Sequence, residues 1–330
     1  MHKDQGLDAT AFETVTGPMP SPAFDRRAIP SDARFREWQA ADGWKYRILE
    51  RPGEAGTPAL GSLLFAGGRG DFIEKYLEAQ DHWHRSGRNV ASFDWRGQGA
   101  SQGGRPGGHI DSFDTLVGDL AGLIDSWMAR TPGPHAVIAH SMGGHVLLRT
   151  LAERNPPVAA AVLVAPMLMI NSAPVPEFAA AWLAGTASLF GLSGQPAWQQ
   201  PSKPQPAGSL RQAYLTGCRE RYADELFWWG KNPGFDLGAP SWGWLRAAFA
   251  SCAALTPAKL AALRTPVLLV GTERDRLVSP AAIRRAASQL PNAELLMFDD
   301  SAHEILRERD EVRLKALAAI DSFLERHSGR

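Results

Sequence analysis

Short apolar runs alternate with longer segments of helical periodicity along most of the chain. Residues Phe113–Met128, for example, place apolar side chains three and four positions apart, as an amphipathic helix does. This alternation predicts an α/β fold, in which helices cover both faces of a mostly parallel central sheet. Six runs have the composition of buried strands: Ser62–Phe65, Asn89–Phe93, His135–Ala139, Ala159–Ala165, Pro266–Val270 and Glu294–Phe298.

The pattern also predicts how the chain is divided. Residues 1–33 are polar, contain several prolines and lack periodicity, so we expect an extended N-terminal lead-in. Phe35–Gln39 and Trp44–Glu50 flank an Ala-Asp-Gly turn and predict a hairpin. A helix is expected to begin at Ser279-Pro280, with serine as its N-cap. We assign residues 34–166 and 256–330 to one α/β core.

Residues 167–255 interrupt this alternation between two predicted strands, so we interpret them as an inserted, mostly helical cap. The segment holds six of the eleven tryptophans, which suggests a substrate pocket with apolar walls. Its uncharged stretch Phe178–Ser202 has fewer consecutive apolar residues than the roughly 20 that span a bilayer, but it could touch a membrane surface. The candidate pocket residues are Trp182, Leu183, Leu189, Phe190, Phe227, Trp228 and Trp229.

Composition narrows the classes of function. The 35 basic and 35 acidic residues balance, which removes the electrostatic argument for a nucleic-acid partner. Cys218 and Cys252 are too few for a disulfide framework, and the N-terminus lacks an apolar signal-peptide core, so we expect a cytoplasmic protein. No phosphate-binding loop or metal-ligand motif is present, so we expect neither a cofactor nor a metal. Nothing in the sequence indicates a particular oligomeric state.

A serine lies where the predicted strand His135–Ala139 gives way to a helix, in the sequence Ala139-His140-Ser141-Met142-Gly143. A sharp strand-to-helix turn exposes the hydroxyl of such a serine above the sheet and requires small residues around it. The usual motif is Gly-x-Ser-x-Gly, and here Ala139 replaces the first glycine. We predict that Ser141 is a nucleophile, whereas the neighbouring His140 and His145 are expected to pack without a chemical role.

A nucleophilic serine requires a base and an acid that orients it, in the chain order Ser, Asp or Glu, His. Asp275 and His303 follow the last two predicted strands and therefore lie at their carboxyl ends, where ligands meet open α/β sheets. Glu273 lies on the same loop as Asp275 and remains the alternative acid.

The oxyanion of an acyl-transfer reaction requires two backbone N–H donors. Met142, which follows the serine, is the first candidate. The glycine-rich loop Ala66–Asp71 permits close backbone approach, so we assign the second donor to the Arg69 amide. The Arg69 side chain is expected to be exposed to solvent.

Five segments together resemble the α/β-hydrolase superfamily: GGRGDFIEKY, DWRGQGAS, AHSMGG, GTERDRLV and SAHEIL. More narrowly, they resemble the bacterial lysophospholipase and monoacylglycerol-lipase-like hydrolases over about residues 35–325. The chain departs from these relatives at Ala139 and in the loop FAGGRG, where many of them have His-Gly. The resemblance implies catalytic roles for Ser141, Asp275 and His303, and oxyanion roles for the Arg69 and Met142 amides.

These residues predict a serine hydrolase that cleaves carboxylic esters through an acyl-enzyme. The resemblance implies lipids with a single acyl chain, such as lysophospholipids or monoacylglycerols. The alternatives are a small-ester carboxylesterase, an acyltransferase with the same triad, and a non-catalytic ligand-binding protein on the hydrolase fold.

Overall fold

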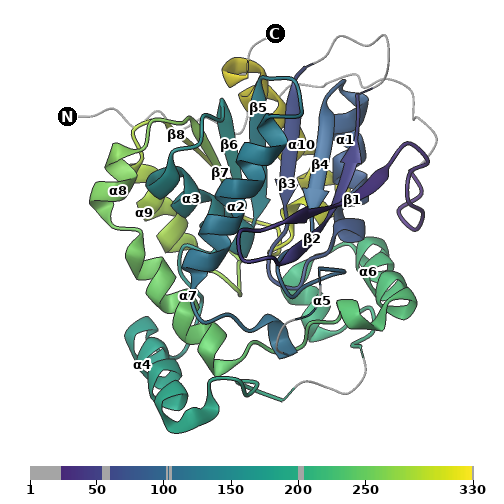
Figure 1. The fold of residues 1–330 in the computed structure, drawn as a ribbon. Helices are drawn as coiled ribbons and strands as arrows, with labels where there is room; N and C mark the ends of the chain where they lie inside the picture. The colour runs from purple at the N-terminus through teal and green to yellow at the C-terminus, as the bar shows by residue number, and fades with distance from the viewer. Residues whose placement is uncertain (1–23, 54–59, 102, 104–105, 200–203, 329–330) are drawn as a thin grey trace.

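The computed structural model describes residues 24–53, 60–101, 103, 106–199 and 204–328, and one eight-stranded sheet forms its centre (Figure 1). The strand order is β1-β2-β4-β3-β5-β6-β7-β8. The hairpin β1–β2 is antiparallel and joins β4 in antiparallel pairing, whereas β3 to β8 all run parallel to one another. The strands are β1 (Arg34–Gln39), β2 (Lys45–Arg51), β3 (Ser62–Ala66), β4 (Asn89–Phe93), β5 (His135–His140), β6 (Ala160–Val164), β7 (Val267–Thr272) and β8 (Ala293–Phe298).

Successive residues of the central strands enter two different hydrophobic clusters. In β5, Val137 and Ala139 pack with helices α2, α3, α8 and α9 on one face, and Ala136 and Ile138 pack with α1 and α10 on the other. This two-sided burial explains the continuous apolar runs and confirms the predicted α/β class. The core helices are η1 (Ile73–Tyr76), α1 (Leu77–Arg85), η2 (Pro106–Gly108), α2 (Phe113–Met128), α3 (Met142–Arg154), α8 (Pro257–Ala262), α9 (Pro280–Gln289), η5 (Ile305–Arg307) and α10 (Asp310–His327).

The segment between β6 and α8 is mostly helical and lies along the edge of the sheet where the parallel strands end (Figure 1). No helix in the described part of the chain has the length and apolar character that crossing a bilayer requires. The helices of this inserted segment are α4 (Glu177–Ala187), the π-helical turn η3 (Ser188–Leu192), α5 (Leu210–Leu215), α6 (Arg219–Lys231), η4 (Pro233–Phe235) and α7 (Trp242–Ala254).

Part of the predicted N-terminal lead-in lies against the inserted segment, while residues 1–23 fall outside the described residues. The Trp228 indole N–H of α6 donates to the Arg26 carbonyl (3.0 Å), and Arg26 and Arg27 both pair with Asp224 of the same helix. The start of the described chain is thus fixed to α6 by charge pairs and a hydrogen bond.

Candidate active site

Ser141 occupies a strained turn between the end of β5 and the start of α3. Its backbone has φ 50° and ψ −116°, a conformation that L-residues rarely adopt. The turn packs against the loop after β3, since a Cβ atom on Gly143 would lie 2.3 Å from the Gly67 carbonyl oxygen. Gly143 therefore permits this approach, while Ala139 is fully buried in the core, so its extra methyl group is accommodated.

The structure brings the three predicted side chains into one hydrogen-bonded chain. His303 Nε2 lies 2.9 Å from Ser141 Oγ, and His303 Nδ1 lies 2.7 Å from Asp275 Oδ2. Asp275 is positioned by the turn after β7, where the backbone N–H groups of Leu277 (2.8 Å) and Val278 (3.0 Å) donate to its Oδ1. One carboxylate oxygen is thus held by the backbone, and the other is left for the imidazole.

The electrostatics of this pair define the tautomer of His303. Burial raises the pKa of Asp275, but the adjacent His303 and the two backbone donors outweigh burial, so the pKa lies below its usual value. Asp275 therefore only accepts hydrogen bonds, and His303 must carry its proton on Nδ1. Burial lowers the pKa of His303, but the Asp275 charge more than compensates and raises it. Neutral His303 consequently offers the Nε2 lone pair to the Ser141 hydroxyl.

Glu273, the alternative acid, lies elsewhere on the same loop. Its carboxylate accepts from the Arg284 Nε (2.8 Å) on α9, at a position open to solvent. The loop itself is tied to the His303 loop because Thr272 Oγ1 donates to the Ser301 carbonyl (2.9 Å). The geometry favours Asp275 over Glu273 as the partner of His303.

The two predicted oxyanion donors lie on segments that meet beside Ser141. Among the described residues, the backbone N–H groups of Arg69 and Met142 have no hydrogen-bond acceptor. The Gly68 N–H, by contrast, donates to Asp71 Oδ2 (2.6 Å) and is not available to a ligand. The loop can therefore offer the Arg69 amide to a substrate oxygen while its neighbour holds the loop in place.

The Arg69 side chain differs from the expectation that it is exposed to solvent. Its Nη2 donates to the carbonyls of Gly107 and Gly238, both at 2.9 Å, and the guanidinium lies 5.2 Å from the ring centroid of Trp244. Burial lowers the pKa of Arg69 to about 9. The side chain joins the oxyanion loop to the inserted segment instead of extending into water.

A buried polar group for which no role was predicted lies next to the triad. His140 Nδ1 lies 2.8 Å from Asp71 Oδ2 and 3.0 Å from the Tyr76 hydroxyl, and the His140 and His303 ring centroids are 4.8 Å apart. Strands β3 and β5 are neighbours in the sheet, so the residues that follow them meet at its edge. That adjacency, which depends on sheet order, is the signal that could have identified the group.

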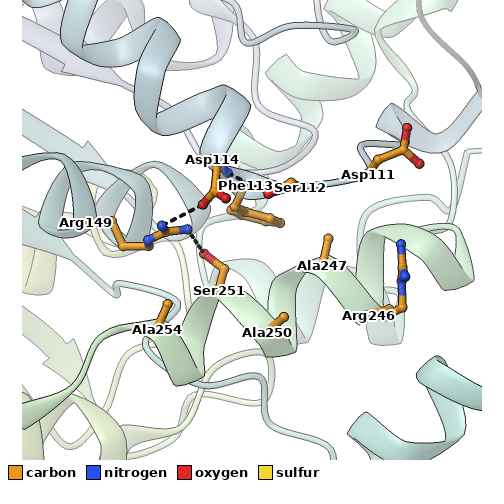
Figure 2. Close-up of a pocket in the computed structure, with 10 residues that line it drawn as sticks. All are labelled: Asp111, Ser112, Phe113, Asp114, Arg149, Arg246, Ala247, Ala250, Ser251 and Ala254. Atoms are coloured by element: carbon orange, nitrogen blue, oxygen red, sulfur yellow. Dashed lines mark hydrogen bonds and ion pairs between the residues drawn. The ribbon is translucent and has the colours of Figure 1, made fainter. Parts of the chain in front are cut away.

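His145, in contrast, behaves as expected of a packing residue. Burial lowers its pKa to about 3, so it is neutral, and its Nε2 lies 2.6 Å from Ser251 Oγ on α7. Ser251 also accepts from Arg149 Nη1 (3.0 Å) at the wall of a cavity of about 280 Å³ between α2, α3 and α7 (Figure 2). None of the three predicted catalytic residues lines this cavity.

The aromatic side chains predicted to form an acyl pocket are arranged differently. Trp182, Leu189 and Phe190 are 70%, 88% and 80% exposed, so they do not line an enclosed pocket. Trp228 and Trp229 are buried, but they pack with Phe72, Ile73 and Phe235 in a separate hydrophobic cluster. The predicted pocket wall is therefore wrong for both stretches: one faces solvent and the other fixes α6 to the core.

Comparison with known proteins agrees with this architecture. The family described as serine aminopeptidase, S33 matches residues 57–310. Lysophospholipase L2 of Escherichia coli K12 is 32% identical over 290 residues, covering 81% of each chain. A probable lysophospholipase L2 of Haemophilus influenzae is 28% identical over 289 residues, covering 84% of this chain and 87% of its own.

A solved structure supports the same fold. A soluble variant of monoglyceride lipase from Saccharomyces cerevisiae, in complex with a substrate analog, superimposes with a TM-score of 0.71 at 17% identity. The match covers 93% of this chain and 100% of the other. Together with the family match, it confirms the predicted resemblance: the chain has the α/β-hydrolase fold and belongs to the serine aminopeptidase S33 family.

Proposed function

We propose that the protein is a serine ester hydrolase in which Ser141, His303 and Asp275 form the catalytic triad. The observation that carries this proposal is the position of His303, with one ring nitrogen 2.9 Å from the Ser141 hydroxyl and the other 2.7 Å from the Asp275 carboxylate. That order of contacts is what proton transfer from serine requires. A ligand-binding protein without activity would not need an aligned base and a strained serine turn.

In the proposed reaction, His303 Nε2 takes the Ser141 proton as Oγ attacks the ester carbonyl carbon. The carbonyl oxygen becomes an oxyanion, to which the Arg69 and Met142 amides donate. The tetrahedral intermediate collapses, and the alcohol leaves with the proton from His303. Water then loses a proton to His303 and attacks the acyl-enzyme, which releases the carboxylic acid and restores Ser141.

The proposed substrates are lipids with one acyl chain. Two relatives matched over more than four fifths of their length are named lysophospholipase L2 and probable lysophospholipase L2, and a human relative matched over 42% of its length is named monoglyceride lipase. The inserted segment, which we interpret as a cap, exposes five large apolar side chains along α4 and η3, which we call the apolar patch: Phe178, Trp182, Leu183, Leu189 and Phe190. A concentration of exposed apolar side chains marks a surface that contacts lipid or protein. We assign it to the lipid surface from which the substrate is taken.

The proposed cellular location remains the cytoplasm. Cys218 and Cys252 are both free and buried, and burial raises the pKa of Cys252 to about 12. Two buried thiols that form no disulfide are what a protein of a reducing compartment is expected to have.

A substrate series tests the lipid assignment. For p-nitrophenyl esters kept below their micelle concentrations, kcat/KM should increase from acetyl toward medium chains, because each acyl methylene that leaves water on binding contributes about 0.8 kcal/mol, or nearly fourfold. Monoacylglycerols and lysophospholipids should be better substrates than two-chain phospholipids. A maximum at acetyl would instead indicate a small-ester carboxylesterase, acyl transfer to added alcohols an acyltransferase, and faster cleavage of amino-acid p-nitroanilides a peptidase.

The apolar patch has its own test. The double variant Leu189→Ser/Phe190→Ser should bind phosphatidylcholine vesicles at least about tenfold more weakly. The reason is that it lacks the two large apolar side chains that would otherwise move from water into the lipid surface. Its kcat/KM for monomeric p-nitrophenyl butyrate should stay within twofold of wild type. Leu314→Ser on α10, where the side chain is 55% exposed, is the matched control and should change neither quantity. Unchanged vesicle binding in the double variant would contradict the assignment.

A further inference from the structure

We propose that Asp71 is a positioning residue for the oxyanion hole: one oxygen of its carboxylate ties the loop that carries the Arg69 amide to the turn that carries Ser141 and the Met142 amide. This inference rests on the proposed esterase function and assigns a role to residues outside the triad.

A single atom, Asp71 Oδ2, makes both connections. It accepts from the Gly68 N–H at 2.6 Å and lies 2.8 Å from His140 Nδ1. Gly68 directly precedes Arg69, and His140 directly precedes Ser141. The two segments that supply the oxyanion donors are therefore held by the same acceptor, each one residue away from its functional residue.

The protonation states follow from the surroundings of Asp71. Lys75 Nζ lies 2.7 Å from Asp71 Oδ1 and is buried with it. Burial raises the pKa of Asp71, but Lys75 and His140 outweigh burial and hold it well below its usual value. The carboxylate is therefore charged and accepts only, so His140 carries a proton on Nδ1 and donates it. Hydrogen bonds to a charged acceptor are the stronger kind.

The loop and the serine turn have no spare room between them. A Cβ atom on Gly68 would lie 2.9 Å from Ser141 Cβ, 3.1 Å from His140 Nδ1 and 3.1 Å from Asp71 Oδ2. Gly68 thus lies between the Asp71 carboxylate and Ser141, and it has no side chain to fix its backbone. Its amide hydrogen bond to Asp71 therefore helps to define the direction in which the next amide, that of Arg69, is presented.

Asp71 is not needed merely to neutralise the buried charge of Lys75. Lys75 also lies 2.6 Å from Glu304 and 3.5 Å from Glu225, and both of these carboxylates are buried. Removal of Asp71 therefore leaves Lys75 compensated, so we expect the chain to fold. Among the described residues, Asp71 alone connects the Gly68 amide to His140.

The first test compares substrate turnover with binding of an oxyanion mimic. Asp71→Ala should lower kcat for p-nitrophenyl butyrate between about tenfold and hundredfold, somewhat less than complete loss of an oxyanion donor, with KM within twofold of wild type. A trifluoromethyl ketone, to which Ser141 adds to give a tetrahedral oxyanion, should lose affinity by the same factor. Asp71→Asn should recover most of the loss, because its amide oxygen can still accept from Gly68. Asp81→Asn, which removes a buried carboxylate paired with Arg51 and Arg85 instead, should retain wild-type kcat.

The second test asks whether Asp71 and His140 act through one connection. His140→Phe keeps an aromatic ring but removes the donor, and the double variant with Asp71→Ala should be no slower than Asp71→Ala alone. Additive losses, a wild-type kcat in Asp71→Ala, or a change confined to KM would each overturn the proposal. Wild-type protein without Ser141-dependent hydrolysis would overturn the proposed function, and this inference with it.

Discussion

Replacing Ser141 by alanine is expected to lower kcat for ester hydrolysis by about 10⁶-fold while the free energy of unfolding changes little. The members of a triad act as a unit, so loss of the nucleophile removes nearly all covalent catalysis. The only hydrogen bond of the Ser141 side chain in the described structure is the one to His303, so little stability depends on it. His303→Ala should be similarly inactive, because no base would then accept the Ser141 proton. Initial rates with p-nitrophenyl butyrate, thermal unfolding and labelling by a fluorophosphonate measure these effects.

The chain provides a matched control for this experiment. Ser251 Oγ also lies close to a histidine nitrogen, 2.6 Å from His145 Nε2, but no carboxylate of the described residues pairs with His145 Nδ1, and Ser251 lines a cavity that none of the three triad residues lines. Ser251→Ala should therefore retain both activity and labelling. Residual activity above a few per cent in Ser141→Ala, or labelling that persists there, would contradict the proposed nucleophile.

The fold was predictable because burial leaves a clear signal in a parallel sheet. Strands buried on both faces appear as uninterrupted apolar runs, and the prediction for β4, Asn89–Phe93, coincides with the observed strand. The predicted strand His135–Ala139 is one residue shorter than β5. Ser141, Asp275 and His303 could be proposed from the sequence because each follows the end of such a strand.

The Asp71–His140 pair could not be predicted in the same way. The two residues are 69 positions apart, and β4 lies between β3 and β5 in the sequence but not in the sheet, where β3 pairs directly with β5. Neither the identity of His140 nor the Arg-Gly-Asp sequence that ends in Asp71 indicates this contact. Sheet order is a property of the whole chain, and it decides which loops meet.

The inserted segment shows a second reason for failure. The uncharged stretch around α4 has no polar face, so its sequence does not indicate which side is buried. In the structure the small Ala184 is fully buried, whereas Trp182, two positions before it, faces solvent. Hydrophobicity suggested a pocket wall there, but α4 packs mainly on α7 and leaves its large side chains exposed.

Asp275→Asn is expected to lower kcat by about 10⁴-fold, in line with the loss of the orienting acid in other triads. The structure indicates how the asparagine would orient. The N–H groups of Leu277 and Val278 donate to Asp275 Oδ1, so the amide oxygen should occupy that position. The amide NH₂ then points toward His303 Nδ1 and favours the tautomer with its proton on Nε2. That nitrogen can no longer accept the Ser141 proton.

The same variant should also shift the pH profile. Hydrolysis requires neutral His303, so kcat/KM falls as pH decreases through the His303 pKa, which the Asp275 charge holds above its ordinary value. Asparagine removes that charge while burial still lowers the pKa, so the acid limb should move to lower pH. Glu273→Gln loses only a solvent-exposed pair with Arg284 and should keep kcat within about twofold and the limb in place. A larger loss in Glu273→Gln than in Asp275→Asn would transfer the role of the acid to Glu273, because only the residue that faces His303 can set both its tautomer and its pKa.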